Sequence, residues 1–476
     1  MDTLDRPDQD DLSEQDPAIL ERVVWRKLDR WVLPMCTAFH LISFFDRSNI
    51  GNARVAGMQT ALKISNYQYT MALTVTYVPF ILMELPSNLI LKYVGPNLTL
   101  PTMVTLWGIV ATMQGLVTSY TGLLLCRFFL GLTEGALFPG LVLYLSTFYP
   151  RERLQFRVTT FYASASLSGA FSGLLATAIT QMNGVGGKPG WAWIFILEGL
   201  FTFIFGIFSF LVLPRSPETA YFLSSEERSY IVSKLKSSRA ISDDDREDHF
   251  SWIEVLRAIH SPQVLMLCVA VFFNGTLLYG LAFFEPTIVA GLGYTGNQAQ
   301  LMSVPPFAVA FSASIISAFI SDQYGCRGLT VIFFAIWGII GFSMFYATTS
   351  HHIQYASLFF SVTGPYTSAP AAFTWAANNS APHIRRASSI AFVTAAGNLG
   401  GILATWLLGS LSPAPEYTAA TITFISISIG LVVVSSLNLF YLSQENRAKA
   451  ETRLSMAKHD EPGCLGDRSA WFVYTL

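Results

Sequence analysis

The sequence predicts an all-α integral membrane protein whose twelve transmembrane helices form two six-helix bundles, with both termini cytoplasmic. Three observations predict this class. Of the 476 residues, 52% are hydrophobic and 13% are charged, with a mean hydropathy of +0.45, whereas about 25% of the residues of a soluble protein are charged. Apolar stretches long enough to cross a bilayer recur along the chain. One long polar segment divides them into two sets of six.

The apolar stretches give the order of the predicted spans. Each is close to or above the roughly 20 residues that a helix needs to cross the hydrocarbon core. The first six cover residues 31–51, 67–93, 98–119, 121–148, 156–181 and 191–213. The second six cover residues 263–290, 298–321, 328–349, 352–377, 387–410 and 417–442. They define an N-terminal membrane domain at 31–213 and a C-terminal membrane domain at 263–442.

Three polar segments lie outside these two domains. Residues 1–30 begin with several acidic side chains and lack a signal-peptide pattern, which indicates a disordered cytoplasmic tail. Residues 214–262 form a cytoplasmic linker, in which Ser224 and Glu227 have the spacing of a helix-capping box. Residues 443–476 form a second cytoplasmic tail.

The basic residues set the orientation, because Lys and Arg collect on the cytoplasmic side of a membrane protein. With both termini inside, the external loops contain only Arg54, Lys63 and Lys188, and most of the 29 Lys and Arg residues are cytoplasmic. The formal net charge of −2 offers no strong field for nucleic acid. We therefore expect the lipid bilayer as a partner, and no nucleic acid.

The sequence has no pattern typical of an enzyme or a metalloprotein. The five cysteines are scattered and lack the spacing of metal ligands. No set of nucleophile, base and orienting group is recognisable. We expect no catalytic residue, no metal and no cofactor.

A few ionisable residues remain inside the predicted spans, where burying a charge is costly and therefore indicates a functional or paired group. They are Asp46, Arg47, Glu84, Arg127, Glu134, Glu198 and Glu285, together with His40, which is interpreted as a hydrogen-bonded core histidine. Arg127 and Glu134 are seven residues apart, which places them on one face of the fourth span, about 10 Å apart along its axis. We expect these two side chains to face the same cavity.

Arg47 and Arg127 are expected at similar depths in the membrane. The helical rise per residue puts Arg47 roughly 6 Å and Arg127 about 9 Å from the outer face. Two cations in this position favour a bound carboxylate, whose oxygens match the planar donors of arginine. The predicted substrate is therefore a small organic anion.

Asp46 and Glu134 are the candidates for binding a coupling proton. Burial favours the neutral form of a carboxyl and a neighbouring arginine favours the charged form, so anion binding to the arginine changes the protonation of the carboxyl. Proton-coupled symport follows from this arrangement. The alternative is that these buried charges form internal ion pairs that fix helix packing, and the two interpretations can coexist.

The remaining buried carboxyls are interpreted differently. Glu84 and Glu198 are assigned to structural hydrogen bonds with neighbouring donors. Glu285 precedes Pro286, which frees backbone groups in its helix, so Glu285 is either a gate residue or a local hydrogen-bond partner. Close helix contacts are indicated by GxxxG patterns beginning at Gly131, Gly169 and Gly397.

Three stretches of the sequence resemble a known family. They are DRSNIGNA at 46–53, ELPSNL at 84–89, and CRFFLG at 126–131 together with EGALFPG at 134–140. From about Trp25 to Leu442 the chain resembles the major facilitator superfamily. Within it, the chain resembles the anion:cation symporter family, most closely the fungal allantoate and nicotinate permease-like branch.

The resemblance implies the major facilitator fold, in which two six-helix domains rock around a central cavity. It implies proton-coupled uptake of an organic anion, with the anion bound by Arg47 and Arg127. It also implies that Asp46 and Glu134 take part in proton coupling. The polar residues expected to line the cavity and contact the substrate are Tyr77, Tyr279 and Asn398.

The candidate gate residues follow from where the chain keeps or departs from the family pattern. The loop after the eighth span keeps Asp322 and Arg327, whereas the equivalent loop after the second span lacks the usual Asp-Arg pattern. Glu285 stands where related sequences carry an apolar residue, which indicates an unusual substrate or a different proton route. Glu285, Asp322 and Arg327 are therefore the candidate gate.

The sequence thus predicts a secondary active transporter, not an enzyme, which imports a small carboxylate with protons by alternating access. Candidate carboxylates are a ureide, a nicotinate-like acid or a vitamin-like acid. The alternatives are a uniporter or exchanger of organic anions, or a nutrient receptor that does not transport. The resemblance indicates the plasma membrane, and the architecture can function as a monomer.

Overall fold

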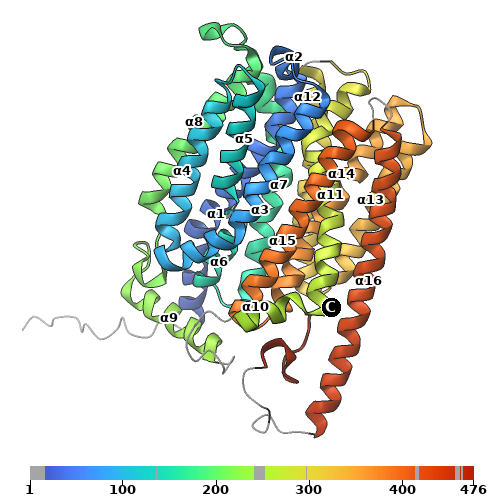
Figure 1. Cartoon of the computed structure of the whole chain (residues 1–476). Coiled ribbons are helices and arrows are strands. Elements are labelled where there is room, and N and C mark those ends of the chain that lie inside the picture. Colours follow the sequence, from blue (N-terminus) through green and yellow to red (C-terminus); the bar gives the residue numbers. More distant parts are fainter. Residues whose placement is uncertain are drawn as a thin grey trace, which may run out of the picture.

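The computed structural model describes residues 17–135, 137–240, 252–295, 297–412, 417–455, 461 and 465–476. In these ranges the protein is a bundle of long helices standing side by side (Figure 1). The first half contains α1 (Pro17–Val55), α3 (Asn66–Val94), α4 (Pro96–Gln114), α5 (Tyr120–Glu134), α6 (Leu137–Phe148), α7 (Arg151–Thr180) and α8 (Gly190–Val212). The second half contains α11 (Pro262–Gly291), α12 (Asn297–Tyr324), α13 (Arg327–Ala347), α14 (His351–Asn378), α15 (His383–Trp406) and α16 (Thr418–Ser455). Shorter helices at the ends of the bundle are α2 (Met58–Ala61), α9 (Ser225–Ala240) and α10 (Trp252–Ile259).

The predicted spans correspond to the long helices of the two six-helix bundles. The fourth span consists of α5 followed by α6, and the eleventh continues from α15 into a π-helical turn at Leu407–Leu411. In the described residues, eight spans are long and apolar enough to cross a membrane by length and composition alone. The helices α1, α3, α4 and α14 do not meet that measure, but they stand in the same bundle beside those that do (Figure 1).

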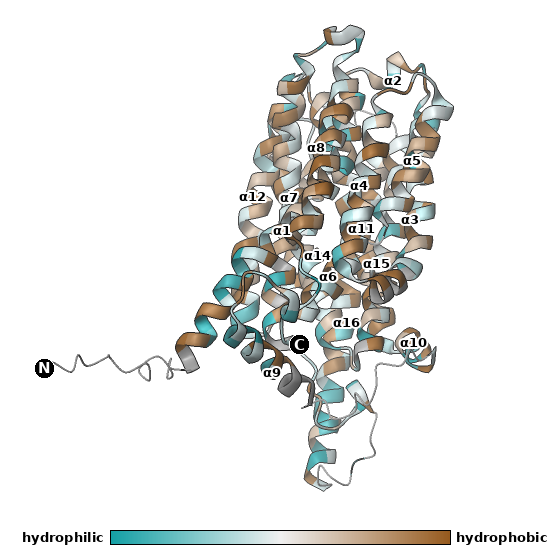
Figure 2. Cartoon of the chain, turned by 90° about the vertical axis from the view of Figure 1, so that its left-hand side faces the viewer, coloured by the Kyte–Doolittle hydropathy of each residue, from teal (hydrophilic) through white to brown (hydrophobic). Residues whose placement is uncertain are grey.

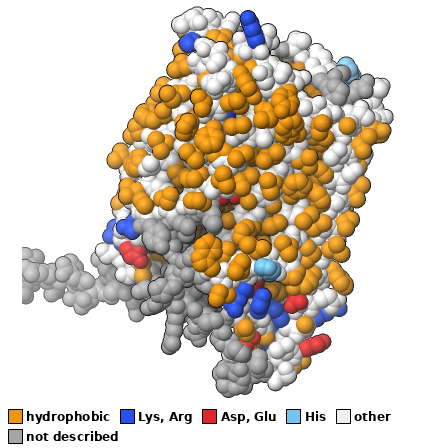
Figure 3. Space-filling view, viewed as in Figure 1, with side chains coloured by type: hydrophobic (Ala, Val, Ile, Leu, Met, Phe, Trp, Pro, Cys, Tyr) orange, Lys and Arg blue, Asp and Glu red, His pale blue; other side chains and the backbone are white. Residues whose placement is uncertain are grey.

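The outer surface is that of a membrane protein. Large apolar side chains point outward from several helices, with exposed fractions of 69% for Leu82, 79% for Leu211 and 65% for Phe319. Apolar residues dominate the length of the bundle, and polar residues concentrate toward its ends (Figure 2). On the face drawn in Figure 3, hydrophobic side chains form a continuous band between charged groups at the two ends. Such a surface is stable only in contact with lipid, so the chain is a multi-pass integral membrane protein.

The N-terminal tail is shorter than the sequence predicts, because α1 begins at Pro17 instead of near residue 31. Val24, Leu28 and Val32 recur at every fourth position and are fully buried. This spacing places them on one face of a helix, where they pack against other parts of the first half. Residues 1–16 of the predicted tail lie outside the described residues.

The linker contains the helix that its sequence predicts. Ser224 and Glu227 make both hydrogen bonds of a capping box at the start of α9, from the backbone N–H of Glu227 to Ser224 Oγ (3.3 Å) and from the backbone N–H of Ser224 to Glu227 Oε2 (2.8 Å). Lys27 of α1 donates to both oxygens of Glu227, at 2.7 and 2.9 Å, and so attaches the linker to the first half.

The C-terminal segment, which the sequence predicts to be a tail, also contains defined structure. The helix α16 continues past residue 442 to Ser455, and residues 466–476 return to the end of the second bundle. There, Asp467 forms an ion pair with Arg385, and Trp375 Nε1 donates to the carbonyl oxygen of Thr475 at 2.9 Å. We call the end of the bundle that carries this segment and the start of α1 the terminal end, and the opposite end, which carries α2, the far end (Figure 1).

The attachment of α9 is expected to weaken in acid. Burial raises the pKa of Glu227, but hydrogen bonds from Lys27 and Ser224 outweigh it, so the pKa lies below its usual 4.5. A carboxyl with a lowered pKa stabilises the folded state above its ordinary pKa, and this contribution is lost as pH falls through the lowered value. We therefore expect the protection of the α9 amides, measured against their intrinsic exchange rate at each pH, to fall as the pH drops below 4.5, by an effect of about 1 kcal/mol.

Hydrogen exchange followed by mass spectrometry measures this effect. In the Glu227→Gln variant, protection of α9 should be weaker at neutral pH and should no longer depend on acid. Equal protection of α9 in both proteins at every pH would contradict this role of Glu227.

The two bundles meet closely at the far end. There, α1 packs against α11, α3 against α15, and α7 against α12. Hydrogen bonds join the Thr70 and Ser410 hydroxyls (3.1 Å) and link Thr177 to Gln300 (3.2 Å) across these contacts. The structure is therefore closed at the far end.

Small residues make the close contacts that the GxxxG patterns predict. A Cβ atom at Gly131 would collide with the carbonyl oxygen of Thr76 on α3. One at Gly173 would lie 2.6 Å from the carbonyl oxygen of Gln300 on α12, and one at Gly401 would collide with the Tyr77 hydroxyl on α3. The patterns at Gly169 and Gly397 therefore bring the two halves together, whereas the pattern at Gly131 packs the first half.

Replacing Gly51 is expected to open the far end. A Cβ atom there would lie 2.5 Å from the carbonyl oxygen of Phe283, so α1 and α11 must separate. In the Gly51→Ala variant we expect the closed arrangement to lose about 1–3 kcal/mol. Electron spin resonance distances between labels on the loops at the far end should lengthen. The control is Gly338→Ala, since a Cβ there meets only Ser428 Oγ at 3.8 Å; equal distances in the two variants would contradict the prediction.

Candidate functional site

The four charged residues of α1 and α5 singled out in the sequence come together in one buried cluster. Asp46 and Arg47 lie on α1, and Arg127 and Glu134 lie on α5. Asp46, Arg127 and Glu134 are only 1–2% exposed. Because Arg127 and Glu134 are two helical turns apart, both can reach the same pair of residues on α1.

Arg47 is paired with Glu134. Its Nε and Nη2 atoms lie 3.0 and 2.9 Å from Glu134 Oε1, and the Ser43 hydroxyl donates to the same oxygen at 2.5 Å. The guanidinium also lies over the rings of Phe44 and Phe80, at 5.1 and 4.9 Å from their centroids. The internal ion pair that the sequence left open as an alternative is thus present between these two residues.

Arg127 is buried without an equivalent partner. Among the described residues, its Nε and Nη2 atoms donate no hydrogen bond, although both are buried. These two nitrogens form one edge of the guanidinium group, the edge that binds a carboxylate through two parallel hydrogen bonds. Its central carbon lies 6.0 Å from the centre of the Phe195 ring, and Arg127 interacts electrostatically with Asp46 and Glu198.

Asp46 is held by Trp107, a tryptophan that no sequence pattern distinguishes. Trp107 Nε1 on α4 donates to Asp46 Oδ2 at 3.0 Å, while Oδ1 has no hydrogen-bond partner among the described residues. Because Trp107 lies in an ordinary apolar stretch, no local signal distinguishes it from a packing residue. It fixes the orientation of a carboxyl that has one free oxygen near Arg127.

A chain of hydrogen bonds extends from this cluster into the second half. Arg47 Nη1 donates to the Tyr279 hydroxyl on α11 at 2.6 Å, and that hydroxyl donates to Asn398 Oδ1 on α15 at 3.1 Å. Asn398 Nδ2 donates to Glu84 Oε1 on α3 at 2.9 Å. The Tyr77 ring packs edge-on against Tyr279 with centroids 5.7 Å apart. The three polar residues expected at the cavity therefore lie together with Arg47, where the two halves meet.

Glu84 and Glu198 have the hydrogen-bonded surroundings that the sequence assigned to them. Glu84 accepts from Asn398, and Glu198 accepts from Asn49 Nδ2. Glu198 also interacts electrostatically with Asp46 and Arg127, so it lies at the edge of the charged cluster.

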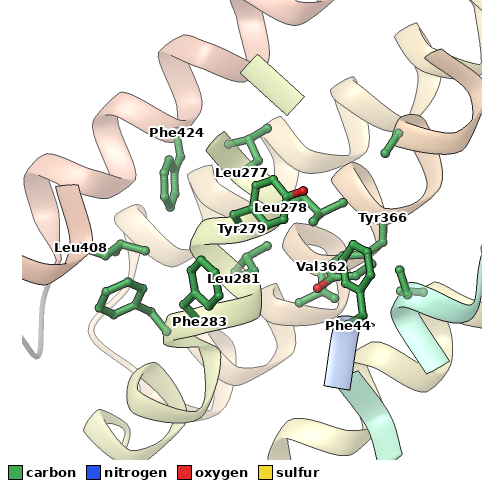
Figure 4. Packing of buried hydrophobic residues seen from close by; sticks show 14 of the residues in the cluster. Phe44, Leu277, Leu278, Tyr279, Leu281, Phe283, Val362, Tyr366, Leu408 and Phe424 are labelled. Atoms are coloured by element: carbon green, nitrogen blue, oxygen red, sulfur yellow. The ribbon is translucent and has the colours of Figure 1, made fainter. Parts of the chain in front are cut away.

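Aromatic rings surround the cluster. Phe44 of α1 stacks on Tyr279 with centroids 6.5 Å apart (Figure 4). Toward the terminal end, Phe373 of α14 meets Tyr162 of α7 and Phe138 of α6, with centroids 5.4 and 5.0 Å apart. The rings contributed by both halves give the region an apolar lining next to the arginines.

The three candidate gate residues are not part of this cluster. Glu285 of α11 is fully buried in the second half, toward α12 and α14. Asp322 and Arg327 form an ion pair between the end of α12 and the start of α13, at the terminal end. A gate role for these residues stays a prediction.

Comparisons with known proteins agree with the architecture. A sequence model of the Major Facilitator Superfamily matches residues 37–405 and 267–462. An uncharacterised transporter of Schizosaccharomyces pombe is 35% identical over 454 residues, which cover 94% of this chain and 89% of that protein. A high-affinity nicotinic acid transporter of Saccharomyces cerevisiae is 26% identical over 430 residues, which cover 90% of this chain and 79% of that protein.

Solved structures show the same fold. A proton:xylose symporter bound to 6-bromo-6-deoxy-D-glucose matches with a TM-score of 0.68 at 15% identity, covering 86% of this chain and 94% of that chain. A bacterial homologue of the human lysosomal transporter Spinster, in an inward-facing and occupied conformation, matches with a TM-score of 0.62 at 15% identity, covering 86% and 96%. The relatives and the fold are those of transporters and not of enzymes, and the chain belongs to the Major Facilitator Superfamily.

Proposed function

We propose that the protein is a proton-coupled symporter that imports a small organic carboxylate. The observation that carries this proposal is the buried edge of Arg127, whose Nε and Nη2 atoms have no partner among the described residues. A cation buried in a membrane protein without a counter-charge in contact is unfavourable, and a carboxylate on this edge would satisfy both nitrogens at once. The substrate would thus supply hydrogen bonds that the protein does not.

The ion pair between Arg47 and Glu134 supports a proton-linked step. When Glu134 takes up a proton, it no longer neutralises Arg47, and the freed guanidinium can attract the carboxylate together with Arg127. When the anion leaves, Glu134 loses its proton and pairs with Arg47 again. Asp46, with one free oxygen beside Arg127, is the second candidate for proton coupling in this cycle.

The hydrogen bonds that cross between the halves connect binding to movement. Arg47 donates to Tyr279, which connects it through Asn398 to Glu84. A substrate that draws Arg47 away from Tyr279 weakens this chain, so anion binding changes the contact between the two membrane domains at 31–213 and 263–442. Alternating access follows if these domains rock about the cluster.

The substrate class follows from the arginines and the rings around them. A small carboxylate with a flat ring, such as a pyridine carboxylate, fits both features, and one relative is named a nicotinic acid transporter. The distribution of Lys and Arg supports a cytoplasmic terminal end, which makes the far end external. Import across the plasma membrane by a monomer is the corresponding physiological role.

Uptake of labelled carboxylates into cells that express the protein tests this function. The panel should contain nicotinate, a ureide acid such as allantoate, and biotin, each at acidic and at mildly alkaline external pH. The proposal requires that one acid accumulates faster at acidic pH. Accumulation without pH dependence would select a uniporter or exchanger, and binding without accumulation would select a receptor.

A further inference from the structure

Glu285 forms a second buried acidic site, separate from the charged cluster of the first half. Its side chain is 0% exposed, and among the described residues neither carboxyl oxygen accepts a hydrogen bond. The other buried carboxyls of the spans, at Asp46, Glu84, Glu134 and Glu198, each accept at least one.

The groups that face Glu285 are neutral. From α12, the Ser303 hydroxyl lies beside the carboxyl, but it donates its proton to the carbonyl oxygen of Gln300 at 2.7 Å. From α14, Tyr355 and Tyr366 interact with Glu285 electrostatically, and Tyr355 donates to the carbonyl oxygen of Met302 at 2.9 Å. A carboxylate ion would therefore lie in an apolar interior without a counter-charge in contact, which is highly unfavourable.

The nearest arginines on α1 are engaged elsewhere. Arg47 pairs with Glu134 and Tyr279, and Arg54 lies over the rings of Tyr69 and Phe284, at 4.4 and 5.7 Å from their centroids. Neither forms an ion pair with Glu285. A neutral, protonated carboxyl is the form that fits these surroundings.

From the burial, the missing partners and the neutral neighbours, we propose that Glu285 is a second proton-binding site, located in the second half of the transporter. In the conformation closed at the far end it holds a proton, as a neutral acid between α11, α12 and α14. When the far end opens, water reaches the carboxyl, which then exchanges its proton with the solvent on that side. Proton binding at Glu285 stands on the observations above, whereas its coupling to substrate rests on the proposed function.

Two features connect this site to the rest of the protein. Tyr366 interacts electrostatically with Glu285 and also with Tyr279 and Arg47, and it lies in the same buried core as Tyr279 and Phe44 (Figure 4). Its hydroxyl is buried and has no hydrogen-bond partner among the described residues. Tyr366 therefore senses the charge of both Glu285 and the pair of Arg47 and Tyr279.

The second feature is the backbone next to Glu285. Pro286 has no N–H to donate within α11, and Phe283 presents its carbonyl oxygen to Gly51 of α1 in the closed far end. Glu285 therefore lies two residues from the contact that must break when the far end opens. Its hydration follows directly from that motion.

Infrared spectroscopy of the purified, lipid-reconstituted protein tests proton binding without any substrate. The probe is the proton alone, and the signal is the carbonyl stretch of a protonated carboxyl in apolar surroundings, which shifts in heavy water. We expect the wild type to show this band at neutral pH and Glu285→Gln to lose the component that Glu285 contributes, so that the band becomes weaker. The matched controls are Glu84→Gln and Glu198→Gln, which should keep the Glu285 component, so that combining either with Glu285→Gln weakens the band further.

A second variant at the same position keeps the infrared test decisive. Glu285→Met also removes the acid, and its side chain suits the apolar surroundings, so a folded protein with a weaker band supports the proposal even if the Gln variant is unstable. A band of undiminished intensity in a folded Glu285 variant, or a wild type without any such band, overturns it.

Coupling is tested with nicotinate and a pH-sensitive dye inside proteoliposomes. The number of protons that enter with each nicotinate should fall by one in Glu285→Gln compared with wild type. An unchanged ratio, with the infrared band weakened, would refute the coupling of this site. If the wild type moves no carboxylate of the panel, the proposed function fails, and the infrared result still decides whether Glu285 binds a proton.

Discussion

Replacing Arg127 with alanine is expected to reduce carboxylate uptake roughly 100-fold. The variant removes two charge-assisted hydrogen bonds to the substrate, a loss of about 2–3 kcal/mol, and each 1.4 kcal/mol corresponds to about tenfold. Thermal stability should change little, because neither Nε nor Nη2 of Arg127 has a hydrogen-bond partner to lose among the described residues. Uptake of the transported acid and thermal unfolding of the purified variant measure the two effects.

Two further variants make this result specific. Arg127→Lys keeps the charge but not the planar pair of donors, so we expect uptake between that of the wild type and that of the alanine variant. Arg447→Ala removes an exposed arginine from the extension of α16 and should leave uptake unchanged. If Arg127→Ala instead lost stability and kept its rate per folded molecule, Arg127 would be a packing residue and not a binding residue.

The second large effect is expected at Glu134. The Glu134→Gln variant keeps the shape of the side chain but leaves Arg47 buried without its ion-pair partner, which should cost about 3 kcal/mol of stability. The glutamine resembles the protonated acid, so the variant should still bind the carboxylate. Its uptake should be equal at acidic and mildly alkaline pH, whereas the wild type should be faster in acid.

The pH profile separates a coupling role from a structural one. A purely structural Glu134 would lower the amount of folded protein and leave the shape of the pH profile intact. The control is Glu227→Gln, which also removes a carboxylate paired with a cation, but on the linker at the terminal end. A Glu134→Gln variant that keeps the wild-type pH dependence would contradict the proposed coupling.

The spans and the capping box could be predicted because their signals are local. Apolar length determines which segments cross the membrane, and the spacing of Ser224 and Glu227 determines where α9 begins. The extent of α1 could have been predicted better, since Val24, Leu28 and Val32 already show the periodicity of a packed helix face. The acidic residues before them outweighed this signal.

The pairing of the buried charges could not be predicted, because it depends on how helices are rotated against one another. The sequence brings Arg127 and Glu134 onto one face of a helix, but it does not show that Arg47 reaches Glu134 while Arg127 stays unpaired. The roles of Trp107 and Tyr366 could not be predicted either. Whether the polar atom of an aromatic side chain forms a hydrogen bond depends on its neighbours in the folded protein. The same holds for Glu285, because its lack of a hydrogen-bond partner results from the packing of α11, α12 and α14 around it.

Above all, we propose that a carboxylate and a proton move together through the cluster of Arg47, Arg127 and Glu134. Proteoliposomes without any imposed gradient, loaded with a pH-sensitive dye, test it most directly when labelled nicotinate is added outside. We expect the interior to acidify as nicotinate enters. Arg127→Ala should abolish both the entry of nicotinate and the acidification, and Glu134→Gln should admit nicotinate with fewer protons. Entry of nicotinate into wild-type vesicles with no change of internal pH would contradict it.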